Sequence, residues 1–378
     1  MTSSRKYRSR NPPSVHVSIE RPQPCSIAGF DGIDPARCIE EEELPGYRAD
    51  RFYPVRLGEI LQGRYHILTK LGFGSSSTTW LARDLVARGY VALKIYVHTS
   101  LVHRELPAYD RIAHRVADSS HRGRGNIRSL LDSFETAQMR LRDMKVVFRP
   151  NAFDEEFVRG AIIELLEALD LLHTQAEIVH TDVHTGNMLL GAYDNEIFKT
   201  MEEYELTFPV PRKQISDTRT IYHSRAMRPN GGPMLLSDFG EARIGPGPHG
   251  GDIMPLEYRA PETLLYVAWS YPVDIWSVGL TDWDLLEPKR LFTVRDNAAH
   301  FAQLIAALER RADFWDDQGK WLGLAPIPKD RMMESLGTQL KDKTGFLRFI
   351  RRTLTWLPEK RPTAKELLKD PWLVEKTS

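Results

Sequence analysis

Three polar residues near the middle of the chain have types and a spacing that suit chemistry on phosphates. His180, Asp182 and Asn187 lie in the stretch V-H-T-D-V-H-T-G-N, between the apolar runs Ala161–Leu172 and Met188–Leu190. An Asp carboxylate on a tight loop can accept the proton of a hydroxyl group. An Asn side-chain oxygen five residues later can hold a Mg²⁺ ion on nucleotide phosphates. Alone, this pattern also arises by chance in unrelated proteins, so the elements around it decide its meaning.

A glycine-rich turn precedes this loop, between predicted strands at Tyr65–Leu71 and Thr78–Asp84. Its glycines let backbone N–H groups approach phosphates closely. A Gly-x-Gly turn alone more often marks an ordinary hairpin, and here a serine takes the third glycine position of G-x-G-x-x-G. The chain has no G-x-x-x-x-G-K-[ST] motif, which disfavours a P-loop NTPase. The residues that we predict to contact a nucleotide here are Leu71, Gly72, Phe73, Gly74, Ser75, Ser76, Ser77 and Thr79.

A lysine stands within the apolar strand predicted at Tyr90–Tyr96. If Lys94 is buried, its charge must face a compensating group. Nucleotide phosphates and a carboxylate would serve, and Glu105 is the best carboxylate on the helix predicted at Val102–Val116. A surface lysine on an edge strand is the alternative, which the glycine-rich turn just before it disfavours. We predict that Ala92 and Lys94 both contact the nucleotide.

A second acidic residue follows a short apolar strand predicted at Met234–Leu236. Asp238, in S-D-F-G, would chelate the Mg²⁺ ion that bridges the phosphates. Two further pairings have scaffold roles. Asp274 could accept backbone N–H bonds from the loop that carries Asp182, and Arg361 could form an ion pair with Glu262.

The order of these residues resembles that of the eukaryotic protein-kinase family over roughly residues 64–373. The resemblance implies an α+β, bilobal protein-kinase fold, with a small β-rich N-lobe and a large, mainly helical C-lobe. It also implies that Asp182 is the catalytic base and that Lys94, fixed by Glu105, positions the α- and β-phosphates. Asn187 and Asp238 would hold Mg²⁺. The cofactors implied are ATP and Mg²⁺.

Three features are similar to the SR-protein-kinase branch, and to its fungal members in particular. The glycine-rich turn runs into S-T-T-W-L-A-R-D, and Thr181 stands where most kinases have Arg. The spacer from Asn187 to Asp238 covers 51 positions (187 to 238), against about a dozen in most kinases of this pattern. The resemblance implies a serine/threonine kinase that acts on protein, without establishing Arg/Ser-rich proteins as its substrate.

The segment from Phe239 to Arg259 contains no Ser or Thr, and Tyr258 carries its only hydroxyl. Thr181 replaces the Arg that would bind a phosphate on this activation segment. With neither phosphosite nor receptor, we predict that packing, and not phosphorylation, holds the segment in its active form.

Two residues depart from the family pattern near the site. His184, a candidate catalytic residue, stands where the family usually has a Lys that contacts the γ-phosphate, and a neutral His would stabilise that charge less. Pro255 stands where Ser/Thr kinases usually have a Thr that touches the catalytic Asp.

The chain is short between the strand predicted at Ile127–Phe134 and the next helix. A kinase needs a fifth strand, an adenine-binding hinge and a short helix there. Lys145–Phe148 could be that strand, with a hinge at residues 149–150. Alternatively, Met139–Phe148 is the helix after the hinge, and the strand and hinge are missing. We favour the second interpretation because L-R-D-M-K is similar to the family's helix.

The short hinge leaves two readings of the function open. The leading one is an active ATP-dependent protein kinase, because a scaffold has no physical need for all four polar residues Lys94, Asp182, Asn187 and Asp238. The alternative is a catalytically impaired kinase-fold scaffold. A small-molecule kinase of the aminoglycoside or choline type is disfavoured, since those proteins lack the Ala-Pro-Glu and late Arg constellation.

Composition narrows the class of partner. The 378 residues carry a formal net charge of +0, which argues against nucleic-acid binding through phosphate contacts. No apolar run approaches 18 residues, so no membrane span is expected. Cys25 and Cys38 precede any plausible core and read as free thiols.

We expect a monomer that binds protein substrates. The acidic run Glu202–Glu205 could dock basic peptides, although a solvated face is the commoner outcome.

The N-terminal 21 residues are basic and Ser-containing, and prolines interrupt them. This composition suits a disordered tail better than a mitochondrial transit peptide, so we expect a cytoplasmic or nuclear protein, with mitochondria as the weaker alternative. The predicted divisions are a disordered arm at 1–43, a lead-in segment at 44–63, the N-lobe and hinge region at 64–150, the C-lobe at 151–373 with a spacer insert at 191–232, and a tail at 374–378.

Overall fold

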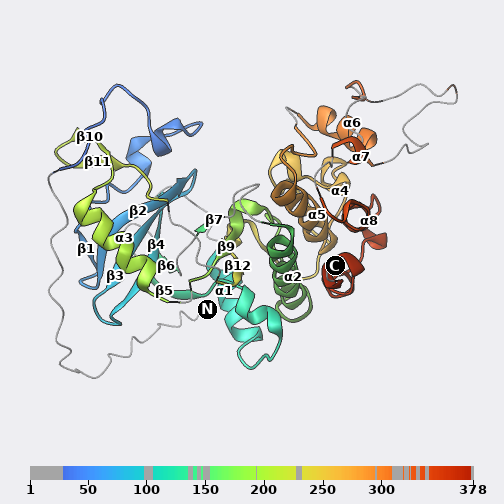
Figure 1. Ribbon diagram of the computed structural model, residues 1–378, viewed down its shortest axis with the longest axis horizontal. Coiled ribbons are helices and arrows are strands. Elements are labelled where there is room, and N and C mark those ends of the chain that lie inside the picture. The colour runs from blue at the N-terminus through green and yellow to red at the C-terminus, as the bar shows by residue number, and fades with distance from the viewer. Residues whose placement is uncertain are drawn as a thin grey trace, which may run out of the picture.

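A strand-rich lobe and a helical lobe form the protein (Figure 1). The computed structural model describes residues 29–97, 105–134, 139–142, 146–147, 154–192, 194–226, 232–293, 296–308, 318, 323, 325–328, 333–336 and 340–375. The first 28 residues, including the basic tail and the candidate targeting segment, lie outside the described residues.

The small lobe is built on a six-stranded sheet with the order β1-β2-β3-β4-β6-β5, in which neighbouring strands pair antiparallel. Apolar residues alternate along β2, β3 and β4, and one set packs with the lead-in segment through Val55. Because side chains alternate between the faces of a strand, this leaves the other face for the functional groups. The strands are β1 (Ile60–Leu61), β2 (Tyr65–Gly74), β3 (Ser77–Asp84), β4 (Gly89–Tyr96), β5 (Leu130–Phe134) and β6 (Met139–Arg142).

The expectation of a missing fifth strand is wrong. Met139–Arg142 is a strand that pairs with β4 on one side and β5 on the other, and it is not the helix after the hinge. The other interpretation is also wrong, because Val146–Val147 (β7) pairs with β9 (Met188–Leu190) in the large lobe. Between two strand edges, β6 satisfies backbone groups on both neighbours, which outweighs the weak helical preference of its sequence. The proposed hinge at 149–150 lies outside the described residues.

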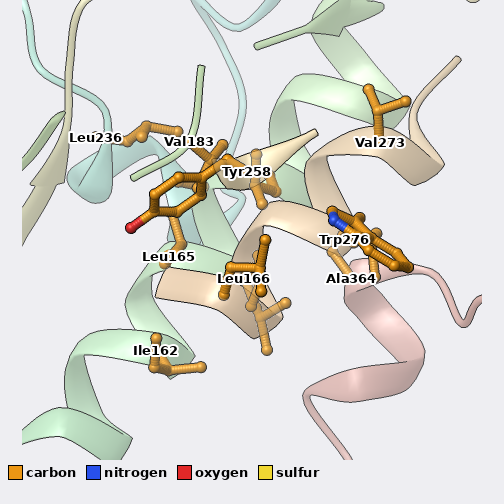
Figure 2. Close-up of a cluster of buried hydrophobic side chains, with 14 of the residues drawn as sticks. Ile162, Leu165, Leu166, Val183, Leu236, Tyr258, Val273, Trp276 and Ala364 are labelled. Atoms are coloured by element: carbon orange, nitrogen blue, oxygen red, sulfur yellow. The ribbon is translucent and has the colours of Figure 1, made fainter. Parts of the chain in front are cut away.

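The large lobe forms around α2 (Glu155–Leu171) and α5 (Pro272–Leu286). Asp154 caps α2, its side chain accepting the Phe157 N–H at 2.8 Å. Figure 2 shows part of the core, where side chains of α2 meet those of α5 and of the catalytic segment. The other helices are α4 (Pro261–Leu264), α6 (Asn297–Ala307), α7 (Met333–Leu336), α8 (Lys343–Thr353), α9 (Ala364–Leu367) and α10 (Pro371–Val374).

Short strands and one helix connect the lobes to the site. β9 pairs with β12 (Met234–Leu236), and β8 (Ile178–Val179) pairs with β13 (Arg243–Ile244). α1 (Glu105–Arg115) lies between the lobes (Figure 1). Its Tyr109 meets Phe239 edge-on, with ring centroids 5.0 Å apart. The helix is therefore coupled to the segment that carries Asp238.

The spacer insert interrupts the large lobe in sequence but packs on the small lobe in space. It contains α3 (Glu196–Thr207) and a hairpin of β10 (Arg212–Ser216) and β11 (Arg219–Tyr222). α3 crosses the small-lobe sheet (Figure 1). Of the acidic run on α3, Glu202 and Glu205 are buried, with salt bridges to Arg83 and Arg225. These two carboxylates therefore do not form a solvent-facing docking surface.

The described part of the N-terminal arm, residues 29–43, is ordered, which corrects the expectation of disorder there. Glu41 contacts the buried ammonium of Lys70 on β2, and Glu40 lies 3.3 Å from the same nitrogen. Glu42 pairs with the buried Lys213 of β10 at 2.8 Å. Buried lysines need opposite charges, and the acidic end of the arm supplies them.

Candidate active site

The catalytic loop follows β8 and is held from below by α5. Asp274 is fully buried, and its carboxylate accepts the backbone N–H groups of His180 at 2.8 Å and Thr181 at 2.7 Å. The predicted scaffold role of Asp274 is confirmed. Burial lowers the pKa of His180 despite the nearby carboxylates of Asp274 and Asp182. The neutral ring fits its contacts, since Nδ1 accepts the Asp182 N–H at 3.3 Å.

Asp182 and Asn187 lie side by side, as their spacing predicts. The Asn187 side-chain nitrogen donates to the backbone oxygen and to Oδ2 of Asp182, both at 2.9 Å. These bonds hold the Asp182 carboxylate and leave the amide oxygen of Asn187 for another ligand. An amide oxygen is a suitable ligand for Mg²⁺.

His184 joins the same cluster. Its Nδ1 accepts the Gly186 N–H at 3.0 Å, which places the proton of a neutral ring on Nε2. Nε2 lies 3.5 Å from Oδ2 of Asp182 and 3.1 Å from the amide nitrogen of Asn187. A Cβ at position 186 would stand 2.8 Å from the imidazole, so any other residue there would displace the His184 ring.

Lys94 bridges two carboxylates from different parts of the fold. Its ammonium lies 2.7 Å from Oδ2 of Asp238 and 3.6 Å from Oε2 of Glu105 at the start of α1. Asp238 has left-handed backbone angles, with φ of 68°. The side chain of Lys94 is 6% exposed, which excludes the alternative of a surface lysine.

The glycine-rich turn covers this cluster. The end of β2 pairs with the start of β3 through Gly74 and Ser77. Beneath the turn is a cavity of about 570 Å³ that reaches the catalytic loop and Asp238. The cavity is lined by every predicted residue of the turn and also by Lys94 and His184. The complete lining is Leu71, Gly72, Phe73, Gly74, Ser75, Ser76, Ser77, Thr79, Lys94, Asp182, His184, Gly186, Asn187, Asp238, Gly240 and Glu241.

Two predicted residues do not line the cavity. Glu105 is buried behind Lys94, where a positioning carboxylate belongs. Ala92 is 0% exposed and lies in an apolar cluster with Leu81 and Phe198. The structure thus brings the phosphate end of the predicted nucleotide site together, whereas α3 covers Ala92.

The donor set fits a magnesium nucleotide. Mg²⁺ is held in such sites by one or two protein ligands and by the phosphates themselves. Asn187 and Asp238 offer two oxygen-bearing side chains on the cavity wall, and Lys94 adds a positive charge. Among the described residues no group of three His, Cys, Asp or Glu side chains could hold a metal by itself.

Sequence reasoning missed a residue that supports Glu105. The Tyr96 hydroxyl donates to Oε2 of Glu105, on the side of the carboxylate that also faces Lys94. Tyr96 lies two residues after Lys94 in β4 and shares its face, so strand alternation was a usable signal.

The predicted pair of Glu262 and Arg361 is confirmed. Arg361 donates to both carboxylate oxygens, at 2.5 and 2.7 Å, and the two side chains are 2% and 0% exposed. A further bond from Arg361 to the backbone oxygen of Thr355, at 2.7 Å, fixes this corner below the activation segment.

Comparisons with known proteins agree with this geometry. The family model described as "Protein kinase domain" matches residues 65–373. A serine/threonine protein kinase of Aspergillus fumigatus is 36% identical over 384 residues, which cover 92% of this chain and 94% of that protein. The serine/threonine-protein kinase SRPK of Physarum polycephalum is 24% identical, over 89% of this chain and 92% of that protein.

Two more comparisons are narrower. SRSF protein kinase 3 of Sus scrofa is 30% identical over 51% of this chain and 36% of that protein. A crystal structure of a kinase domain superposes with a TM-score of 0.65 at 19% identity, covering 85% of this chain and 99% of that one, which supports the fold alone. The chain therefore belongs to the protein kinase family, as a serine/threonine protein kinase similar to the SR-protein kinases.

Proposed function

We propose that Asp182 is the base that receives the proton of a Ser or Thr hydroxyl during phosphoryl transfer. The observation that carries this assignment is the placement of its carboxylate on the cavity wall, held by the amide of Asn187 at 2.9 Å. A carboxylate fixed in this way can orient the hydroxyl before accepting its proton. The imidazole of His184 lies beside the same oxygen, with Nε2 at 3.5 Å.

Lys94 and the glycine-rich turn position the phosphates in this proposal. The ammonium already lies between Glu105 and Asp238, so it reaches the cavity without a rearrangement of β4. The residues of the turn line the same space, and the two glycines leave it unobstructed, so that backbone N–H groups there can approach phosphates closely. Both features preorganise positive charge where transferring phosphate carries negative charge.

Asn187 and Asp238 are the proposed metal ligands. Mg·ATP, when bound, supplies the γ-phosphoryl group and a divalent charge that neutralises its oxygens. The chain contributes the amide oxygen of Asn187, directly before β9, and the carboxylate of Asp238, two residues after β12, at the same end of this strand pair. The Lys94 ammonium donates to Oδ2 of Asp238 at 2.7 Å, which holds that carboxylate at the cavity wall.

Proteins with Ser or Thr in an Arg-rich context are the substrates to test first. Relatives of this chain are named SRSF protein kinase 3. We further propose a monomeric protein of the cytoplasm or nucleus. Within the part of the chain that the structure describes, no helix has the length and apolar character to cross a bilayer.

The test measures transfer of phosphate from Mg·ATP to an Arg/Ser-repeat peptide and to a peptide with Lys in place of Arg. Asp182→Asn should lower transfer by roughly 10²- to 10⁴-fold and keep nucleotide binding, whereas Lys94→Met should weaken binding itself. Asp118→Asn, at an exposed position, is the matched control. Full transfer by Asp182→Asn would show that the role assigned to Asp182 is wrong.

A further inference from the structure

One face of the small-lobe sheet carries both the phosphate-binding lysine and the residues under the insert. Lys94 and Ala92 are two apart in β4, and they pair across β3 with Thr79 and Leu81. Side chains two apart on a strand point to the same face, and so do directly paired residues. These four residues therefore form one continuous surface. Lys94 and Thr79 border the cavity, whereas Ala92 and Leu81 are 0% exposed.

Helix α3 covers the buried half of this surface. Its Phe198 and Met201 form an apolar cluster with Leu81, Ala92 and Leu68 of the sheet. The exposed fractions of the two helix side chains are 7% and 4%. Phe198 also packs against the ring of Tyr90, with centroids 5.8 Å apart. Figure 1 shows α3 lying across the strands of the small-lobe sheet.

Polar contacts hold α3 in this position at two further points. Glu202 accepts a hydrogen bond from the Tyr90 hydroxyl at 2.6 Å and contacts the guanidinium of Arg83. One turn later, Glu205 accepts from the hydroxyl of Thr69 at 3.0 Å. The helix is therefore fixed to β2, β3 and β4 together, on the face that carries Lys94.

The same half of the surface is where the base of a bound nucleotide would lie. The phosphate end is set by Lys94, Asp238 and the glycine-rich turn, which border the cavity. The base must then extend along the sheet from Lys94, and Ala92 and Leu81 are the apolar neighbours on that face. A planar base needs such apolar surface to stack on. In the structure this surface is occupied by Phe198 and Met201.

We propose that α3 is an autoinhibitory element that competes with the purine of ATP for the face around Ala92. This inference rests on the proposed nucleotide site and adds its regulation. With α3 in place, the cavity accepts phosphates and excludes the base. ATP binding at full strength requires α3 to leave, so the apparent Kd equals the intrinsic Kd divided by the fraction of molecules in which α3 is displaced.

Measuring the affinity for two ligands distinguishes this mechanism from a general loosening of the small lobe. Mg·ATP carries a base, whereas Mg·tripolyphosphate carries the same phosphates without one. The double substitution Phe198→Ala with Met201→Ala should weaken the packing of α3 and tighten Mg·ATP binding by about tenfold. Binding of Mg·tripolyphosphate should stay within about twofold, because α3 does not cover the phosphate end. Tyr204→Ala, at a half-exposed position on the same helix, should change neither.

The result that overturns the proposal is a double variant whose Mg·ATP affinity is unchanged or lower while its Mg·tripolyphosphate affinity is kept. A parallel change for both ligands also overturns it. Failure of the proposed nucleotide site looks different, since the wild type would then bind neither ligand and Lys94→Met would alter nothing.

Two further measurements test the proposal even if the double variant does not fold. Glu202→Gln leaves the apolar cluster intact and removes one charge from the contact with Arg83, so it should tighten Mg·ATP in the same direction. In the wild-type full chain, saturating Mg·ATP should increase amide hydrogen exchange within residues 196–207, and Mg·tripolyphosphate should not. Equal protection of α3 with both ligands would refute the competition.

Discussion

The hydroxyl of Thr181 donates a hydrogen bond to the backbone carbonyl of Glu241, with the two oxygens 2.7 Å apart. This bond joins the catalytic loop directly to the start of the activation segment. Thr181 has φ of 66°, and its backbone N–H is held by Asp274. In most kinases an Arg at this position would bind a phosphate on the activation segment. Here the short, uncharged side chain of Thr181 contacts that segment directly.

The first prediction concerns this bond. Thr181→Val keeps β-branching and therefore keeps the backbone strain unchanged, but it removes the donor to Glu241. Loss of one hydrogen bond of about 1 kcal/mol predicts a roughly fivefold fall in kcat/KM for peptide phosphorylation. Phosphatase treatment of the wild type should leave the rate unchanged. Thr200→Val is the control, because the Thr200 hydroxyl is exposed and bonds to a carbonyl within α3. An activating phosphosite mapped between Phe239 and Arg259 would contradict this account.

A second prediction concerns the buried lysine under the N-terminal arm. Lys70 is fully buried and contacts Glu41, Glu40 and the backbone oxygen of Tyr222. Lys70→Met leaves these carboxylates without their cation, which should cost about 3–5 kcal/mol in denaturant unfolding. The double change Lys70→Met with Glu41→Met should recover most of that loss.

The control for this pair is Lys199→Met on the exposed side of α3, which should move the free energy of unfolding by less than about 0.5 kcal/mol. Unchanged stability of Lys70→Met would show that the arm is not anchored through this lysine.

Burial opposes ionisation of Glu40, but Lys70 and Ser224 lower its pKa overall. Acid should therefore weaken the same anchor as this carboxylate is protonated.

The third prediction concerns the buried pair below the activation segment. Arg361→Ala strands the carboxylate of Glu262, and we expect a loss of about 3–5 kcal/mol in unfolding free energy. Arg361→Lys should not restore it, because an ammonium cannot donate to both oxygens in the same fork. Arg348→Ala, whose partly exposed side chain lies 3.5 Å from Asp370, should cost less than about 1 kcal/mol. Similar losses at both arginines would contradict the assignment.

A fourth prediction follows from a buried carboxyl group in α5. Asp282 is fully buried, and neither oxygen has a hydrogen-bond partner among the described residues. Burial raises its pKa well above the usual value, although Arg159 opposes this. The folded protein therefore binds this proton more tightly than the unfolded chain does. The stabilisation is complete below the unfolded pKa and is lost as the pH rises through the folded pKa.

Asp282→Asn, a neutral replacement of equal size, removes this dependence. The variant should therefore gain stability relative to the wild type as the pH increases from about 4, read as the difference between two thermal melting curves at each pH. Asp118→Asn at an exposed position is the comparison, and should show no such trend. A difference that stays constant with pH would mean that Asp282 is already paired.

The sequence by itself predicted most of the residues that line the cavity. Asp182 and Asn187 are five residues apart on one tight loop, so they must lie close together. Local geometry alone decides such a contact. Lys94 and Glu105 were also predicted as neighbours, and their charged groups lie 3.6 Å apart. The contact between Lys94 and Asp238 was not predicted. The pairing of Glu262 with Arg361 followed from the family order of motifs.

The tertiary structure alone decided how the irregular segments are used. Met139–Arg142 carries a helix-like composition, yet it fills the gap between β4 and β5, since unpaired strand edges outweigh weak local preference. Glu40–Glu43 resembles a solvated tail until Lys70 and Lys213 are seen to lack any other nearby carboxylate in the described structure. The position of α3 over Ala92 depends on a contact across more than a hundred residues, and no local pattern in either segment specifies its partner.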